Sequence, residues 1–277
     1  MSFLVLLLAL LLEKFSAARQ RIQQDGIWLR WLSDSEAKGR APEVILALLV
    51  LLPLVALGLL LLAIEPVLYG WLALPVHLLV MMYCLGRGDV LAALGPFRDA
   101  WRRGDIEAAY LVAARDLGVD AEDGSDLLRQ VQGNLLWEGY QGFFAVIFWY
   151  ALLGPLAALA YRLLALVAMH AGQVSLQQLA QRLRHAMDWL PVRLLAVSFG
   201  LVGNFVEVTR TLLHELLSWE VPASKLLHDS GLAGADLSDA ESAEAGVASL
   251  DTIWQLLIRC AVVWYGVLAL GTMFWLG

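Results

Sequence analysis

The chain has 277 residues, of which 60% are hydrophobic and 16% are charged. An ordinary soluble domain carries about 25% charged residues, so this composition excludes that class. The net charge of −7 excludes the basic face that attracts nucleic acid, and no nucleic-acid partner is expected.

Four apolar stretches are each long enough to cross a membrane, at residues 44–64, 67–85, 143–169 and 253–277. Crossing a bilayer core of about 30 Å takes about 20 apolar helical residues. Backbone groups in lipid must be paired within the segment, which requires helices here. The sequence therefore predicts a single integral membrane domain over residues 1–277, all-α, with about four transmembrane helices and the lipid bilayer as a partner.

The N-terminal residues precede the first of these stretches. Residues 1–12 are apolar but lack the basic start and the cleavage site of a signal peptide. Their helix would be about 18 Å long, too short to cross alone. Residues 13–42 combine six basic residues with Trp28, Trp31 and neighbouring leucines, a pattern typical of an interfacial segment. We expect a short apolar N-terminal helix followed by an amphipathic one.

Only Glu65 and Pro66 join the first two stretches, which predicts a tight transmembrane hairpin. Residues 13–42 and 86–142 then lie on the same side, and both are rich in arginine and lysine. The positive-inside rule places them in the cytoplasm.

The third stretch, 143–169, leaves the topology of the later residues open. If it crosses once, residues 170–252 lie on the face opposite to residues 86–142. The Gly154-Pro155 pair favours the alternative of a kinked or re-entrant element.

Residues 86–142 are predicted to be helical. Apolar residues recur at helical spacing on either side of Gly104, and Gly118 is a plausible stop. Asp123 then offers an N-cap for a helix that runs toward Phe143.

Residues 170–252 are predicted to be a helical connecting segment. Two helices, at about 175–190 and 192–219, are expected to be separated at Pro191. Residues 229–251 hold six acidic residues among alanine, serine and glycine, with no basic residue. This composition predicts an acidic solvent loop.

Two polar stripes are the candidate ligand-binding sites. The residues of each stripe fall within about 80° on a helix of 100° per residue. The alternative is that both are solvated helix faces. The candidates are Gln130, Asn134, Glu138 and Gln141 on the first stripe, and Asn204, Glu207 and His214 on the second, which also includes Thr211 and Ser218.

The sequence contains no complete motif for metal binding, phosphate binding or nucleophilic catalysis. His214-Glu215 begins like a zinc-protease motif, but residue 218 is serine where the second histidine should stand. Neither a phosphate-binding Gly-Lys-Ser/Thr loop nor a Gly-x-Ser-x-Gly elbow is present. No catalytic residue, metal site or cofactor is predicted. His77 and Arg162 lie within apolar stretches, where an ionisable group has either a functional or an interfacial role.

Three segments together resemble a known family: Leu-Val-Ala-Ala-Arg-Asp at 111–116, the run at 130–154, and Asp-Trp-Leu-Pro-Val-Arg-Leu at 188–194. They are similar to the AmpE family, a branch of the CobD/CbiB superfamily of adenosylcobinamide-phosphate synthases. The motif residues that match, expected to be structural, are Arg115, Asp116, Asp188, Trp189, Pro191 and Arg193.

The resemblance also shows what this chain lacks. The synthases carry acidic patterns near residues 138–141 and 165–170, and an acid pair where this chain has Arg184-His185. Their ATP-dependent ligation needs Mg²⁺, which is held by carboxylates and phosphates. We therefore expect a synthase scaffold without the synthase site, and no enzymatic activity. An active membrane ligase or transferase related to the synthases is the alternative.

The resemblance implies a regulatory or sensory protein of the bacterial inner membrane, with several membrane passes. Such a protein acts in β-lactamase induction and in the response to β-lactam antibiotics. A muropeptide-derived or lipid-like ligand, and a protein partner in cell-wall recycling, are the binding partners that it implies.

Overall fold

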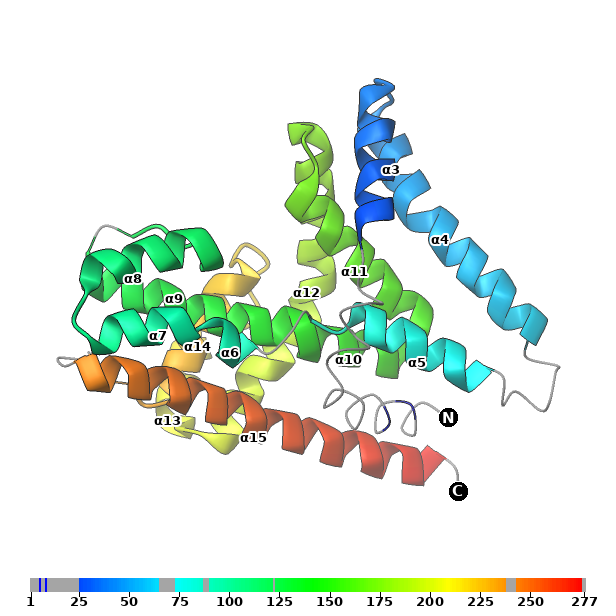
Figure 1. The fold of residues 1–277 in the computed structure, drawn as a ribbon. Helices are drawn as coiled ribbons and strands as arrows, with labels where there is room; N and C mark the ends of the chain where they lie inside the picture. The colour runs from blue at the N-terminus through cyan, green and yellow to red at the C-terminus, as the bar shows by residue number, and fades with distance from the viewer. Residues whose placement is uncertain are drawn as a thin grey trace. The chain divides into compact units, whose positions relative to one another are not determined.

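The computed structural model describes residues 25–64, 73–86, 90–121, 123–237 and 243–275, together with Val5 and Leu8. Every regular element in these residues is a helix (Figure 1), which confirms the all-α prediction. The N-terminal helix expected at residues 1–12 and the Glu65-Pro66 turn lie outside the described residues. Contacts divide the chain into two compact units, one of Met1–Arg87 with Ala145–Asp188, the other of Gly88–Phe144 with Trp189–Gly277.

The first unit packs around one apolar cluster. It contains α3 (Gly26–Ala37), α4 (Pro42–Ile64), α5 (Ala73–Cys84), α10 (Ala145–Leu153), α11 (Pro155–His170) and the first half of α12 (Val174–Val202). Helix α4 begins at Pro42, because proline is tolerated in a first turn. The cluster is contributed by four helices and includes Trp28, Leu32, Ile45, Leu49, Leu163, Val167, Leu176 and Ala180.

Two helices of the described residues are long and apolar enough to cross a membrane: α4, and the part of α15 (Ala243–Trp275) over Ala245–Gly271. Helices α5 and α11 are apolar but shorter. These helices are consistent with a membrane protein, and two of the four predicted spans reach full length.

The third apolar stretch folds back on itself. Helix α10 ends at Leu153, Gly154 adopts φ 80° and ψ −165°, and α11 begins at Pro155. Only glycine adopts this positive φ without strain. Because α10 and α11 pack against each other directly after the break, the chain reverses here. Residues 143–169 thus form a helical hairpin, the alternative that Gly154-Pro155 favoured.

The second unit contains α6 (Val90–Ala93), α7 (Gly95–Arg102), α8 (Ile106–Val112), the π-helix η2 (Ala113–Leu117), α9 (Gly124–Gly139) and the π-helix η3 (Tyr140–Phe144). The end of α12 follows, with α13 (Phe205–Leu212), α14 (Ala223–Gly234) and α15. Helix α9 packs on α14 and α15, while α7 packs on α8 and α15. Residues from both sides of the hairpin therefore share one core.

The boundaries predicted within residues 86–142 are confirmed. Gly104 and Gly118 both have positive φ angles, of 71° and 65°, after α7 and η2. The side chain of Asp123 caps α9 by accepting a bond from the Asp126 N–H at 2.8 Å. This bond and one from the Ser125 hydroxyl lower the pKa of Asp123, so the cap is charged at neutral pH.

The helix boundary predicted at Pro191 is wrong, because α12 continues from Val174 to Val202. Proline removes one backbone bond and costs about 3 kcal/mol in a helix interior. Burial of Val192, Leu195 and Phe199 directly after it offsets this cost. Arg193 also donates a side-chain bond of 2.8 Å to the carbonyl of Trp189, beside the proline.

The acidic loop predicted at residues 229–251 is also wrong in most of its length. Helix α14 extends to Gly234 and α15 begins at Ala243. The small residues that suggested a loop are positions of close packing. A Cβ at Gly231 would meet Leu136 at 2.6 Å, and one at Gly246 would meet Trp101 at 2.4 Å.

Gly203 lies at the tightest junction of this unit, between α12 and α13. Its backbone N–H bonds to Phe199, and the next N–H, of Asn204, donates to the Gly234 carbonyl at 3.0 Å. A Cβ on Gly203 would stand 2.2 Å from that same carbonyl oxygen. The end of α14 therefore requires glycine at residue 203.

We predict that Gly203→Ala destabilises the protein by about 1–3 kcal/mol, the usual cost of overpacking, because a backbone atom cannot move aside as a side chain can. The measurement is the Tm of the purified protein in detergent. Gly95→Ala is the control, since a Cβ there meets nothing within 4 Å. Equal Tm values for the two variants would contradict the prediction.

Candidate functional site

Two buried aspartates of the first unit each pair with a tyrosine and an arginine. Asp25 accepts bonds from the Tyr83 hydroxyl at 3.0 Å and from Arg162 Nη2 at 3.3 Å. Its side chain is 1% exposed. Arg162, which the sequence left between a functional and an interfacial role, thus has a buried carboxylate opposite it.

Asp188 repeats this arrangement with different partners. Its carboxylate accepts a bond from the Tyr161 hydroxyl at 2.8 Å and lies 3.5 Å from Arg184 Nε. The Arg184 guanidinium also lies over the Tyr161 ring, 5.8 Å from its centroid. Because Tyr161 belongs to α11 and Asp188 to α12, the pair fixes one helix to the other.

The Arg184–Asp188 pair sets the charge around the buried Asp188 carboxylate. An acid at residue 184 would put two carboxylates together, an arrangement that attracts a cation or raises a pKa. Arginine at residue 184 neutralises Asp188 instead. Both side chains are at most 10% exposed, so they stabilise each other where neither is well hydrated.

Arg193 holds the turn that follows α13. Its guanidinium donates to the carbonyls of Leu216 and Ser218, and it lies over the Trp189 ring at 4.2 Å from the centroid. The Trp189 and Trp219 rings are 6.1 Å apart. Arginine suits this place because its planar fork bonds several carbonyls while it stacks on an aromatic ring.

The Arg115-Asp116 motif, in contrast, is an exposed pair between neighbouring residues. Arg115 donates two bonds, of 2.6 and 2.7 Å, to the neighbouring Asp116 within η2. These bonds lower the pKa of Asp116 and raise that of Arg115. The pair does not join two helices, and the Arg115 side chain is 71% exposed.

The stripe on α9 is half-buried and bonded locally. Gln130 donates to Asp126 at 2.9 Å, Asn134 donates to the Leu117 carbonyl at 3.4 Å, and Gln141 donates to Glu138 at 2.5 Å. Gln141 lies in η3, directly after α9. These bonds stabilise α9, its junction with η3 and its contact with the end of η2.

The stripe on α13 also has local roles. Asn204 caps α13 by accepting a bond from the Glu207 N–H at 3.3 Å, and it donates to Asp236 at 3.1 Å. Glu207 pairs with Arg210 at 3.1 Å, and His214 is exposed in the turn after α13. Helix α14 packs on both α9 and α13, so the two stripes belong to one compact unit.

Two long-range polar contacts of this unit were not predicted. Gln132 donates to the Ser249 hydroxyl at 2.7 Å, and Arg98 Nη2 contacts both oxygens of Asp251 at 2.7 and 2.6 Å. Their partners are more than 100 residues apart. No local pattern signals such pairs.

The ionisable residue of the second apolar stretch also has a specific partner. His77 Nδ1 lies 2.8 Å from the Tyr150 hydroxyl, and their rings meet edge to face. Because His77 belongs to α5 and Tyr150 to α10, this bond fixes the α10–α11 hairpin to α5.

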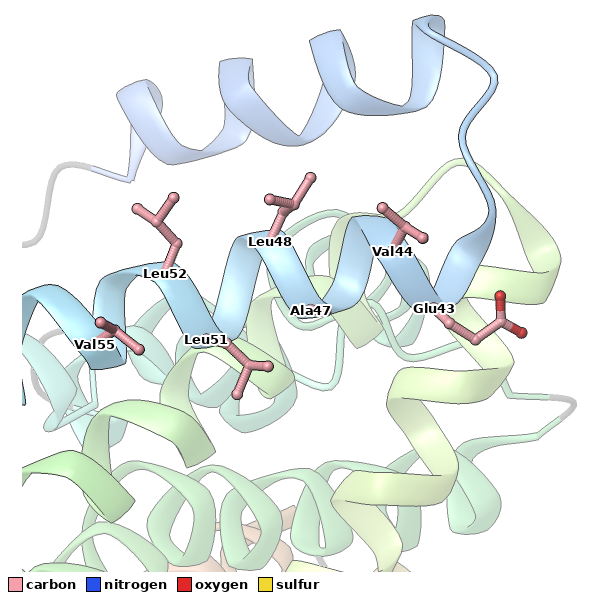
Figure 2. A pocket seen from close by; sticks show the side chains of 7 residues that line it. All are labelled: Glu43, Val44, Ala47, Leu48, Leu51, Leu52 and Val55. Carbon is pink, nitrogen blue, oxygen red and sulfur yellow. The ribbon is translucent and has the colours of Figure 1, made fainter.

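A shallow groove of about 590 Å³ follows α4. Figure 2 shows that its lining side chains all come from this one helix: Glu43, Val44, Ala47, Leu48, Leu51, Leu52 and Val55. Six of the seven are apolar, so the groove suits a hydrocarbon chain better than a polar ligand. Within the described residues, no three His, Cys, Asp or Glu side chains are grouped to hold a metal ion.

The family model described as "Regulatory signalling modulator protein AmpE" matches residues 1–220. Protein AmpE of Shigella flexneri is 31% identical over 166 residues, which are 54% of this chain. The match spans 58% of that relative's length. No solved structure matches the chain.

We predict that Asp188→Asn destabilises the first unit by about 3–5 kcal/mol, the usual cost of removing one member of a buried ion pair. Asp116→Asn is the matched control, since it removes the same charge from an exposed pair and should change stability little. Tm values of both variants, measured in the same detergent, check this. A larger loss for Asp116→Asn would be the contrary result.

Proposed function

Because the chain belongs to the AmpE family of regulatory signalling modulator proteins, we propose that it regulates β-lactamase induction at the bacterial inner membrane, in response to β-lactam antibiotics. The regulatory role comes from the family. Helix α4 and the apolar part of α15 support the membrane location.

We further propose that the protein works by binding, on a degenerate scaffold of the CobD/CbiB superfamily. The observation that carries this proposal is the Arg184–Asp188 pair. Arginine stands where the synthases keep an acid, and it neutralises the buried aspartate that remains. Arg193 is likewise engaged with backbone carbonyls. Asp188 and Arg193, two of the retained motif residues, thus serve the fold, which favours a binding protein over a ligase.

The binding surface that we propose is the polar side of the second unit, which carries the α9 and α13 stripes. Its occupant is a muropeptide-derived or lipid-like ligand, or a protein partner in cell-wall recycling. Glu138 and His214 are the residues of these stripes that suit recognition of a polar group.

We propose a membrane topology in which α4, α5 and α15 cross and the α10–α11 hairpin re-enters on the side from which it came. From residue 143 to Gly154 the helix rises about 16 Å at 1.5 Å per residue, about half of the bilayer core. The Arg98–Asp251 and Gln132–Ser249 contacts join residues 86–142 to residues 170–252. This packing supports one side, the cytoplasm, for both segments.

An induction assay tests the regulatory role. We expect that deleting the gene in a bacterium with an inducible β-lactamase changes the β-lactamase activity reached after exposure to a β-lactam. A plasmid copy of the wild-type gene should restore it. Equal induction with and without the gene would overturn the proposal.

The ligase alternative is tested on the purified protein. We expect no Mg²⁺-dependent ATP turnover with cobyric acid or muropeptides. Turnover that is abolished by Glu138→Ala, and kept by Glu107→Ala at an exposed helix position, would establish the ligase instead.

Labelling of single cysteines tests the topology. With a thiol reagent that does not cross membranes, Asp99→Cys and Glu220→Cys should both stay unlabelled in intact cells and both react after permeabilisation. Each position is exposed, so burial would not mask a reaction. Labelling of only one of the two in intact cells would contradict a common side.

A further inference from the structure

The second half of α12 is apolar on both of its faces. The inner face is fully buried and consists of Val192, Leu195, Ala196 and Phe199. The outer face carries Leu190, Leu194, Val197 and Leu201, which are 41–66% exposed. A helix that is apolar all round belongs in a protein core or in a membrane, and the outer face is not in the core.

The outer residues form one regular stripe. Their spacing of four, three and four residues places them within about 60° at 100° per residue. Between Leu190 and Leu201 the helix rises about 16 Å, which is about the depth of one leaflet of a 30 Å bilayer core. Residues 194–206 carry no charge.

Further exposed apolar side chains follow on α13 and in the turn after it. Phe205, Val206, Leu213 and Leu217 are 63–81% exposed, and Trp219 ends the series at 54%. Arg193 of α12 holds this turn to α12 by donating hydrogen bonds to the carbonyls of Leu216 and Ser218. We call the eight aliphatic and aromatic residues from Leu190 to Leu217 the α12–α13 apolar surface.

This surface adjoins a candidate membrane span. Trp264 of α15 donates a bond of 3.0 Å to the Ser198 hydroxyl of α12. Trp264 lies in the part of α15 that exposes Val262, Val267 and Leu270. A bilayer around that part of α15 would therefore reach α12 beside it.

We propose that the α12–α13 apolar surface inserts into one leaflet of the bilayer and contacts lipid acyl chains. It adds a membrane-embedded element to the spans described above, and it rests on the proposed membrane location. The composition fits lipid, because an uncharged face of large aliphatic residues ends in Trp219, a residue that favours the headgroup zone. The polar residues Glu207, Arg210 and His214 then mark the water side of α13.

Fluorescence quenching in vesicles tests this insertion. Both native cysteines, Cys84 and Cys260, are buried, so single introduced cysteines on the full chain can be labelled with bimane, with unlabelled wild type as the blank. The test positions are Leu201→Cys and Leu217→Cys. The controls are Val267→Cys on α15 for lipid and the exposed Asp120→Cys for water. Phosphatidylcholine vesicles with doxyl-labelled lipid report contact with acyl chains, and aqueous iodide reports contact with water.

We expect doxyl lipid to quench bimane at Leu201→Cys and Leu217→Cys as strongly as it quenches bimane at Val267→Cys. Iodide should quench both test positions less than it quenches bimane at Asp120→Cys. Iodide quenching of both test positions at the level of Asp120, with Val267 still lipid-quenched, would overturn this inference alone. Loss of lipid quenching at Val267 as well would overturn the membrane location. Protection from both quenchers, with cysteine cross-linking between two copies of the chain, would assign the surface to a dimer and overturn the lipid contact.

Discussion

The reversal of the chain at Gly154 is the constraint on which the rest of the structure depends. One glycine with φ 80° turns an apolar stretch of spanning length into two packed helices. Because the chain returns, residues before and after the hairpin build one core, in which α9 contacts α14 and α15. A single straight crossing would have placed those residues on opposite faces of a membrane and made the Arg98–Asp251 contact impossible.

Much of the local structure could be predicted because it depends on neighbours in sequence. Asp123 caps α9 by a bond to a residue three positions away, and Gly104 and Gly118 adopt the positive φ that other residues resist. The class of the fold followed from hydropathy alone. These features need no knowledge of which helices meet.

The wrong predictions concern residues whose secondary structure depends on tertiary contacts. Pro191 reads as a boundary, but buried residues on its far side keep α12 continuous. Residues 229–251 were predicted to be a loop because they are small and acidic. In the structure, however, Leu136 and Trp101 occupy the space that a Cβ on Gly231 or Gly246 would need. Small residues indicate either flexibility or close packing, and only the neighbouring helix distinguishes these.

The candidate site shows the same division. The stripes were predicted as faces of single helices, but Gln141 lies in η3, and His214 and Ser218 lie beyond the end of α13. The bonds of Gln130, Asn134 and Asn204 could not be foreseen. The family motifs also differ in burial, which their amino-acid sequences do not indicate. Asp188 and Arg193 are buried, whereas Arg115 and Asp116 form an exposed pair within the π-helix η2. Two motifs with an arginine and an acid thus have opposite environments.

The position of charge relates these observations to function. A buried carboxylate that faces a second acid can hold a cation, while one that faces arginine is neutral as a pair. Asp188 therefore faces the arginine at residue 184, and it accepts a bond of 2.8 Å from the Tyr161 hydroxyl that joins α11 to α12. These contacts hold two helices together, and they are the physical basis on which the proposed binding role rests.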